Sequence, residues 1–307
     1  MKKSILTAIA VLIVLNASLF ATGTKEDLQT AFDGKNLTNP TTFVDSFNRE
    51  IEIPNEIKKV VSLGPNITEI IAELDSQALA GRTDYCTYPS WIVDVPSIGK
   101  LTSPNIEKII EIDPDLVIGS THVKREIIEI LDKAGITTVG LYEESSLEGS
   151  YKVILDMGIL LNKSEKAKTI VAAMKKDVEN VKETVANLQR PKVYYAVSFG
   201  QWGEYTAGGN TFIGKMINDA GGINIAQDVK GWTYSLESLI DADPDIIIVS
   251  KYFDSFENFS TTAPYNGLRA VKENHLYEID NNKLDRQGIR NAEGMVDLAH
   301  IIHPEAF

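Results

Sequence analysis

Aromatic and arginine side chains gather in loop segments of this sequence, where they can contact a ligand. Trp202 and Trp232 lie in glycine-containing stretches that lack the apolar period of a helix or strand, so core packing explains them less well. Aromatic faces bury large, flat molecules while a polar tip fixes orientation. Arg286 and Arg290 carry planar donors that could grip carboxylate, phosphate or catecholate oxygens, or could pair with surface carboxylates.

The sequence contains no pattern typical of an enzyme active site, and we assign no catalytic residues. Cys86 is the single cysteine, which excludes an intrachain disulfide and multi-cysteine metal sites. It has no evident base beside it, so a packed thiol is expected. Residues 209–215 imitate a phosphate-binding loop, but Met216 replaces the serine or threonine that holds Mg²⁺. No Gly-x-Ser-x-Gly elbow occurs.

Two alternative functions stay open at this point. A protein that binds a bare Zn²⁺ or Mn²⁺ ion would need about four converging ligands, usually histidine and carboxylate. His122 is the one histidine placed after a predicted strand end. The other alternative is a two-lobed enzyme whose catalytic residues the sequence does not reveal.

Composition and charge narrow the class further. The chain has 307 residues, 43% of them hydrophobic and 24% charged, enough to bury two cores of ordinary domain size. The formal net charge of −13 argues against nucleic acid or an anionic lipid surface as a partner, because either needs a basic face.

The N-terminus has the order of a secretory signal. Lys2 and Lys3 precede an apolar run over residues 5–20, and small residues follow to Gly23. We expect a signal peptide at 1–23 and a flexible leader at 24–41, hence an exported, soluble protein in the periplasm or another extracytoplasmic space. An uncleaved membrane anchor is the alternative. No cysteine near the cleavage region offers a lipid attachment site.

Short apolar runs alternate with helical patterns along the rest of the chain, which implies parallel sheets covered on both faces. The expected fold class is α/β, with two Rossmann-like lobes whose parallel-rich sheets are joined by one long rigid helix. The expected domains are an N-terminal lobe at 42–162, a connecting helix at 163–190 and a C-terminal lobe at 191–307. Strands are expected at 60–63, 78–81, 116–120, 137–141, 193–197 and 246–250, and helices at 67–74, 125–134 and 212–220.

The connecting helix is predicted over residues 164–188. Its apolar residues are spaced three and four apart, which keeps them on one face. An ordinary packed surface helix would show the same stripe. Apolar positions are Val171, Met174, Val178, Val181, Val185 and Leu188.

An internal repeat flanks that helix. Residues 106–120 (IEKIIEIDPDLVIGS) match residues 236–250 (LESLIDADPDIIIVS), each a short helix, an Asp-Pro-Asp turn and an apolar strand. Glu107 and Glu237 hold the same place in the two copies. The repeat indicates two related lobes with one equivalent glutamate each.

The chain from about residue 42 onward resembles the periplasmic binding proteins of ABC importers for cobalamin, ferric siderophores and haem. The resemblance rests on the order and spacing of several short motifs. They are REIEIP at 49–54, VVSLGPNITE at 60–69, GRTDYCTYP at 81–89, NIE at 105–107, DPDLV at 113–117, TAGGN at 206–210, AGGIN at 220–224 and RQGIR at 286–290.

The resemblance implies capture of a cobalt- or iron-containing chelate between two lobes and its delivery to an ABC importer, with no resident cofactor. It also implies that Glu107 and Glu237 dock on the two subunits of a homodimeric permease. Because ligands collect outside the carboxyl ends of parallel strands, the candidate ligand contacts fall on two facing walls. These candidates are Tyr85, Phe199, Trp202, Tyr205, Trp232, Arg286 and Arg290.

Overall fold

The structure is a computed structural model, and it describes residues 41–120, 123–142 and 146–307. The predicted signal peptide, nearly all of the predicted leader and His122 lie outside the described residues. Pro40–Phe307 forms one compact unit. The described elements give the predicted α/β fold, with two lobes that each contain a mostly parallel sheet.

The first sheet has four parallel strands in the order β4-β3-β7-β8. Each strand falls within two residues of its predicted bounds. Pro65 sits in the first turn of α1, where its missing N–H costs nothing. The elements of this half are β3 (Val60–Ser62), α1 (Pro65–Asp75), β4 (Leu79–Gly81), α2 (Ile106–Ile112), β7 (Leu116–Gly119), α3 (Arg125–Lys133), β8 (Thr138–Gly140) and α4 (Leu147–Leu160).

The second sheet follows the order β10-β9-β12-β13, with β11 also paired to β9. Its strands are parallel except β10, which runs antiparallel to β9. Its elements are β9 (Lys192–Ser198), β10 (Tyr205–Thr206), α6 (Phe212–Asp219), β11 (Ile223–Asn224), α7 (Leu236–Ala242), β12 (Ile246–Ser250), α8 (Ser255–Thr261), α9 (Arg269–Lys272), β13 (Leu276–Ile279), α10 (Asn282–Asp285) and α11 (Asn291–Ile302).

Two small antiparallel hairpins and four 3₁₀ turns complete the described chain. The hairpins are β1 (Thr41–Val44) with β2 (Glu50–Ile53), and β5 (Gly99–Lys100) with β6 (Ser103–Pro104). The 3₁₀ turns are Ser76–Ala78, Ser90–Asp94, Gly200–Trp202 and Tyr265–Gly267.

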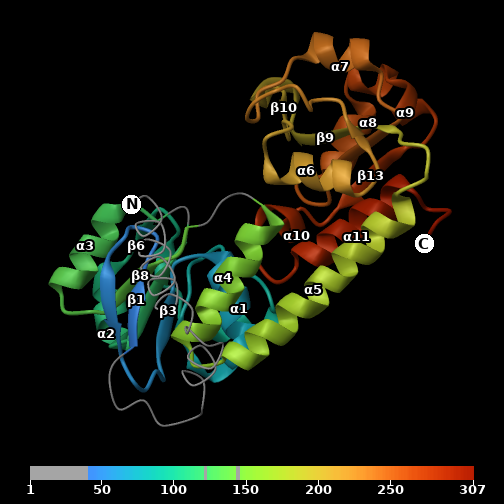
Figure 1. Cartoon of the computed structure of the whole chain (residues 1–307). Helices are drawn as coiled ribbons and strands as arrows, with labels where there is room; N and C mark the ends of the chain where they lie inside the picture. Colours follow the sequence, from blue (N-terminus) through green and yellow to red (C-terminus); the bar gives the residue numbers. More distant parts are fainter. Residues whose placement is uncertain (1–40, 121–122, 143–145) are drawn as a thin grey trace, which may run out of the picture. The chain divides into compact units, whose positions relative to one another are not determined.

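The long helix α5 (Ser164–Val185) packs against α4 and α11, as Figure 1 shows for the yellow-green ribbon. The predicted stripe is buried from Val171 to Val185, together with Ala167. The helix ends at Val185, three residues before the predicted end, because residues 186–188 form a turn in which the Leu188 N–H donates to the Val185 carbonyl at 3.1 Å.

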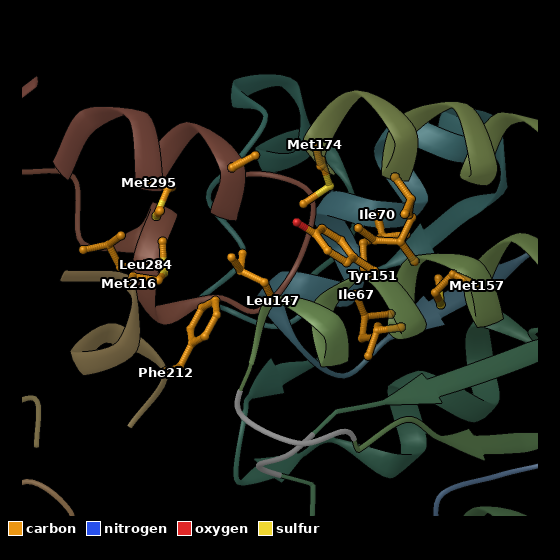
Figure 2. Packing of buried hydrophobic residues seen from close by; sticks show 14 of the residues in the cluster. Ile67, Ile70, Leu147, Tyr151, Met157, Met174, Phe212, Met216, Leu284 and Met295 are labelled. Atoms are coloured by element: carbon orange, nitrogen blue, oxygen red, sulfur yellow. The ribbon is translucent and has the colours of Figure 1, made fainter. Parts of the chain in front are cut away.

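Buried apolar side chains form three clusters rather than two separate cores. Neighbouring residues of a strand point to opposite faces, so Ile246 and Ile248 of β12 join the largest cluster, whereas Ile247 and Val249 join a smaller one. The largest cluster contains residues of both halves. Figure 2 shows part of it, with Tyr151 and Met174 from the first half and α5, and Phe212 and Met295 from the second. Both halves therefore share one continuous core.

Candidate functional site

A cavity of about 720 Å³ opens where the strands of both sheets end. Its wall includes the start of α1 after β3, the residue after β7 and the end of β9, as expected for parallel sheets. Its volume falls in the range of about 300–1,000 Å³ typical of small-molecule sites. The lining residues of the described chain are Pro65, Asn66, Tyr85, Leu101, Ser120, Val197, Phe212, Ile213, Trp232, Asn282, Leu284, Asp285, Arg286 and Gln287.

Three of the predicted ligand contacts line this cavity: Tyr85, Trp232 and Arg286. Tyr85 and Trp232 are 55% and 42% exposed, which is high for large aromatic side chains and leaves their faces available. The two residues belong to different halves of the chain. A flat ligand in the cavity can therefore meet an aromatic ring from each half.

The other predicted aromatic residues lie elsewhere. Phe199 and Trp202 line a second hollow of about 650 Å³ beside Phe253. Phe199 also packs edge-on against Phe259, with ring centroids 4.9 Å apart, so it contributes to the core. Tyr205 is exposed but lines neither of these two hollows in the described chain.

The loop that carries Trp232 is held by close backbone contacts to the TAGGN motif. The Thr206 N–H donates to the Trp232 carbonyl at 2.8 Å, and the Gly209 N–H donates to the Val229 carbonyl at 3.1 Å. A Cβ atom on Gly209 would lie 2.0 Å from the carbonyl oxygen of Gln227, so only glycine fits there. Buried Asn224, from the AGGIN motif, donates to the Ala207 carbonyl at 2.7 Å. These motifs position the Trp232 loop.

The Tyr85 loop is anchored by the neighbouring Cys86. Its thiol is buried and lies 3.0 Å from Thr68 Oγ1 and 3.2 Å from Thr83 Oγ1. This confirms the expected packed thiol. The two threonines belong to α1 and to the loop itself, so Cys86 ties the loop to the helix.

The two predicted arginines converge on a residue that the sequence analysis did not single out. Glu69 of α1, 2% exposed, accepts hydrogen bonds from Arg290 Nε and Nη2 and from Arg286 Nη1, each at 2.8 Å. Arg290 also stacks over the Tyr88 ring at 4.2 Å. Burial alone would lower the pKa of Arg290, but the Glu69 carboxylate raises it. In this structure Arg290 therefore binds Glu69 and connects the two halves of the chain.

A sequence signal for Glu69 existed. It stands among Ile67, Ile70 and Ile71 on α1, where a solvated glutamate would not be expected. A carboxylate on a buried helix face needs a cationic partner, because an unpaired buried charge is costly.

Asp285, at the end of α10, is the acidic group of the cavity wall. Its Oδ2 accepts a hydrogen bond from Asn281 Nδ2 at 2.6 Å. The side chain reaches the open cavity, yet the surrounding protein displaces much of its water. This desolvation raises the pKa of Asp285, while the hydrogen bond from Asn281 and the charge of Arg286 oppose the rise.

Glu107 and Glu237 occupy equivalent helices, as the repeat predicted. Each lies in the first turn of a seven-residue helix, α2 or α7, and each is exposed. Both helices end on an aspartate with left-handed backbone, Asp113 at φ 52° and Asp243 at φ 39°. The exposed residue three positions later is isoleucine in both copies.

The repeat extends to the strand that each helix precedes. Asp115 Oδ2 accepts from the Lys59 N–H at 2.9 Å, and Asp245 Oδ2 accepts from the Lys192 N–H at 2.7 Å. In each copy the side chain of the same lysine also donates to the carbonyl of the last helical residue, which is Ile112 in α2 and Ala242 in α7. The helices that carry Glu107 and Glu237 are therefore anchored to their sheets by equivalent hydrogen bonds.

Metal and membrane features are absent from the part of the chain that the structure describes. Residues 41–120, 123–142 and 146–307 contain no group of three or more histidine, cysteine or carboxylate side chains placed to hold a metal ion. No helix within these ranges is long and apolar enough to cross a membrane.

Comparison with known proteins agrees with this geometry. The periplasmic binding protein family model matches residues 60–283. The chain is 31% identical over 276 residues to the ABC transporter substrate-binding lipoprotein YvrC of Bacillus subtilis, covering 87% of each protein. It is 28% identical over 312 residues to a cobalamin-binding protein of Halobacterium salinarum, covering 97% of this chain and 84% of that protein.

Solved structures show the same fold. The apo form of the periplasmic haem-binding protein RhuT from Roseiflexus matches with a TM-score of 0.74 and 24% identity, covering 82% of this chain and all of that one. Since the family model spans most of the sequence, and YvrC shares nearly a third of its residues over almost the whole length, this chain belongs to the periplasmic binding protein family.

Proposed function

We propose that this chain is the extracytoplasmic substrate-binding protein of an ABC importer and that it captures a cobalt- or iron-containing chelate in the 720 Å³ cavity. The observation that carries the proposal is the cavity itself, which is walled by both halves and offers an exposed aromatic side chain from each, Tyr85 and Trp232. Relatives named for cobalamin binding and for haem uptake support the chelate class. The proposed role is binding and delivery, not catalysis.

Titration with two coloured chelates tests the proposal. Purified protein is titrated with cyanocobalamin and with haemin, and binding is followed by absorbance and tryptophan fluorescence. Trp232→Ala should weaken binding of the favoured chelate by about ten- to a hundredfold, because it removes one large apolar contact. Trp91→Ala is the matched control, since Trp91 is also 42% exposed but lies outside the cavity.

The chelate proposal fails if neither compound binds. Equal losses in the two tryptophan variants would place the ligand outside the cavity. A protein that instead binds a bare metal ion would change the absorbance of neither chelate. Titration with Zn²⁺ and Mn²⁺ would detect such binding separately.

We further propose that Glu107 and Glu237 dock on a homodimeric permease, one glutamate on each subunit. Two equivalent patches on one chain fit a partner with two equivalent sites. Each patch also contains an exposed isoleucine three residues on, Ile110 at 49% and Ile240 at 46%, on the same helix face as the glutamate. No ion pair between described residues involves either glutamate, which leaves both carboxylates for a cationic surface.

Charge reversal tests the docking role. The Glu107→Lys and Glu237→Lys double variant should abolish ligand-dependent stimulation of the importer's ATPase while chelate affinity stays within about twofold of the wild type. Exposed glutamates of α5, in Glu179→Lys with Glu183→Lys, provide the control with the same change in net charge. Wild-type stimulation by the double variant would refute the docking role.

Export is proposed from the N-terminal sequence. YvrC is named as a lipoprotein, whereas the single cysteine of this chain, Cys86, is buried in the first lobe and is not available for lipid attachment. Mass spectrometry of the protein from its native host would identify its mature N-terminus and any lipid.

A further inference from the structure

One short segment supplies more of the 720 Å³ cavity wall than any other stretch of the described chain. It runs from Asn282 to Gln287 and contributes five of the fourteen lining residues. Its first part is α10, a helix of only four residues, and residues 286–290 beyond it belong to no helix or strand. We call residues 282–288 the wall segment. No sheet holds this segment in place, so its position depends on other contacts.

The side chain of Asn291, the first residue of α11, makes four hydrogen bonds, three of them to the wall segment. Its Nδ2 donates to the Lys283 carbonyl at 2.9 Å and to the Arg286 carbonyl at 3.1 Å. Its Oδ1 accepts from the Gly288 N–H at 2.7 Å and from Ser150 Oγ of α4 at 2.8 Å. A primary amide has two N–H donors and two acceptor positions on its oxygen. The hydrogen-bonding capacity of Asn291 is therefore fully used.

A second feature of α11 seats the same segment. Asn291 is completely buried and does not line the cavity, so it acts from behind the wall. One turn later, a Cβ atom on Gly294 would lie 2.8 Å from the Lys283 carbonyl oxygen and 2.7 Å from the Leu284 side chain. The missing side chain of Gly294 lets the wall segment lie directly against the helix. The first turn of α11 thus leaves room for the segment and also binds it.

We propose that Asn291 is a positioning residue that fixes the backbone of the wall segment in the arrangement that a ligand meets. This role rests on the proposed function of the cavity. Without the amide, three backbone groups of the segment lose their partner, which is unfavourable where they are shielded from water. The segment then adopts other arrangements. A chelate that binds only the original one binds more weakly, in proportion to the fraction of molecules that still have it.

Two variants of Asn291 and one control test the role. Asn291→Leu keeps a similar side-chain shape and removes all four hydrogen bonds, whereas Asn291→Asp keeps the acceptor for Gly288 and Ser150 but loses both donors. Ser150→Ala is the control, because it removes the bond to α4 and leaves the three bonds to the wall segment.

Three measurements are made on each protein. Tryptophan fluorescence gives the dissociation constant of whichever of cyanocobalamin and haemin the wild type binds more tightly. Urea unfolding shows that each variant is folded under the binding conditions. Hydrogen exchange read by mass spectrometry reports on peptides that cover residues 282–288, with and without the chelate.

Both Asn291 variants should bind the chelate about tenfold or more weakly than the wild type, while Ser150→Ala stays within about twofold. Without chelate, residues 282–288 should exchange faster in the Asn291 variants than in the wild type and in Ser150→Ala. Saturating chelate should restore their protection. A residue with only a general role in stability would not produce a local loss of protection that the ligand reverses.

The positioning role is overturned if folded Asn291→Asp binds within about twofold of the wild type, if Ser150→Ala loses as much affinity, or if exchange of residues 282–288 is unchanged. Failure of both Asn291 variants to fold, while Ser150→Ala folds, also overturns it, because Asn291 would then serve folding and not the cavity. If the wild type binds neither chelate, the proposed function fails instead, and exchange without ligand still decides whether Asn291 holds the wall segment.

Discussion

Glu69 and Arg290 are joined by two hydrogen bonds of 2.8 Å across 221 positions of sequence. Glu69 lies on α1 of the first half, and Arg290 directly precedes α11 of the second. Both side chains are buried, at 2% and 6% exposure. The ion pair therefore connects the two halves, and Arg286, which lines the cavity, shares the same carboxylate.

Removal of Arg290 should destabilise the folded protein strongly. In Arg290→Met the buried Glu69 carboxylate keeps only the hydrogen bond from Arg286, so we expect a loss of about 3 kcal/mol in the free energy of unfolding. Urea denaturation at pH 7 measures this value. Arg125→Met is the control, because Arg125 pairs with Glu129 on the exposed face of α3, where the loss should stay below about 1 kcal/mol. Equal losses in the two variants would contradict the structural importance of the buried pair.

Asp45 should give the protein a pH-dependent share of its stability. This buried carboxylate accepts hydrogen bonds from Arg49 and from the Gly140 N–H, linking the β1–β2 turn to β8. Burial alone would raise the pKa of Asp45, but these hydrogen bonds outweigh it and hold the pKa below its usual value. Because the pKa is lower in the folded state, the stabilisation is present above the unfolded-state pKa of about 3.9 and is lost as pH falls through the folded-state pKa.

Asp45→Asn should accordingly lower the free energy of unfolding by about 2 kcal/mol at pH 7. The difference between variant and wild type should shrink as the pH falls below about 3.9. Urea unfolding at pH 7, 4 and 3 provides the comparison. A difference that stays constant over this range would show that ionisation of Asp45 is not involved.

Gly209→Ala should disturb the loop that carries Trp232. The added Cβ would lie 2.0 Å from the Gln227 carbonyl oxygen, and a backbone atom cannot rotate away as a side chain can. We expect a loss of about 2 kcal/mol or more in the free energy of unfolding, together with weaker chelate binding. Gly267→Ala is the control, since Gly267 has open space around its Cβ position and no positive φ. Wild-type stability of Gly209→Ala would show that the loop can move aside.

Periodicity and repetition made the fold predictable. Apolar runs located the main strands, and the 3-4 spacing from Val171 to Val185 located the buried face of α5. The match between residues 106–120 and 236–250 identified two helices that share their caps, exposure and lysine contacts. Helices and strands can be predicted from such local patterns because each element buries the face that its own sequence makes apolar.

The site was predicted only in part, because its composition depends on contacts between distant segments. Tyr85 and Trp232 stand out in loops and do line the cavity. Phe212 and Leu284 line it as well, but in sequence they resemble ordinary core residues. Arg290 was predicted as a ligand contact, but in the structure it pairs with Glu69. The isoleucines around Glu69 indicate that this glutamate is buried, but they do not indicate which of the distant arginines pairs with it. Whether the remaining candidates contact ligand stays a prediction.

The largest apolar cluster draws on both sheets and on α4, α5 and α11 at once. If one half unfolds, the apolar side chains of the other half that pack against it become exposed to water. Melting is therefore expected to be cooperative across the whole of Pro40–Phe307, with no stage at which one sheet survives alone.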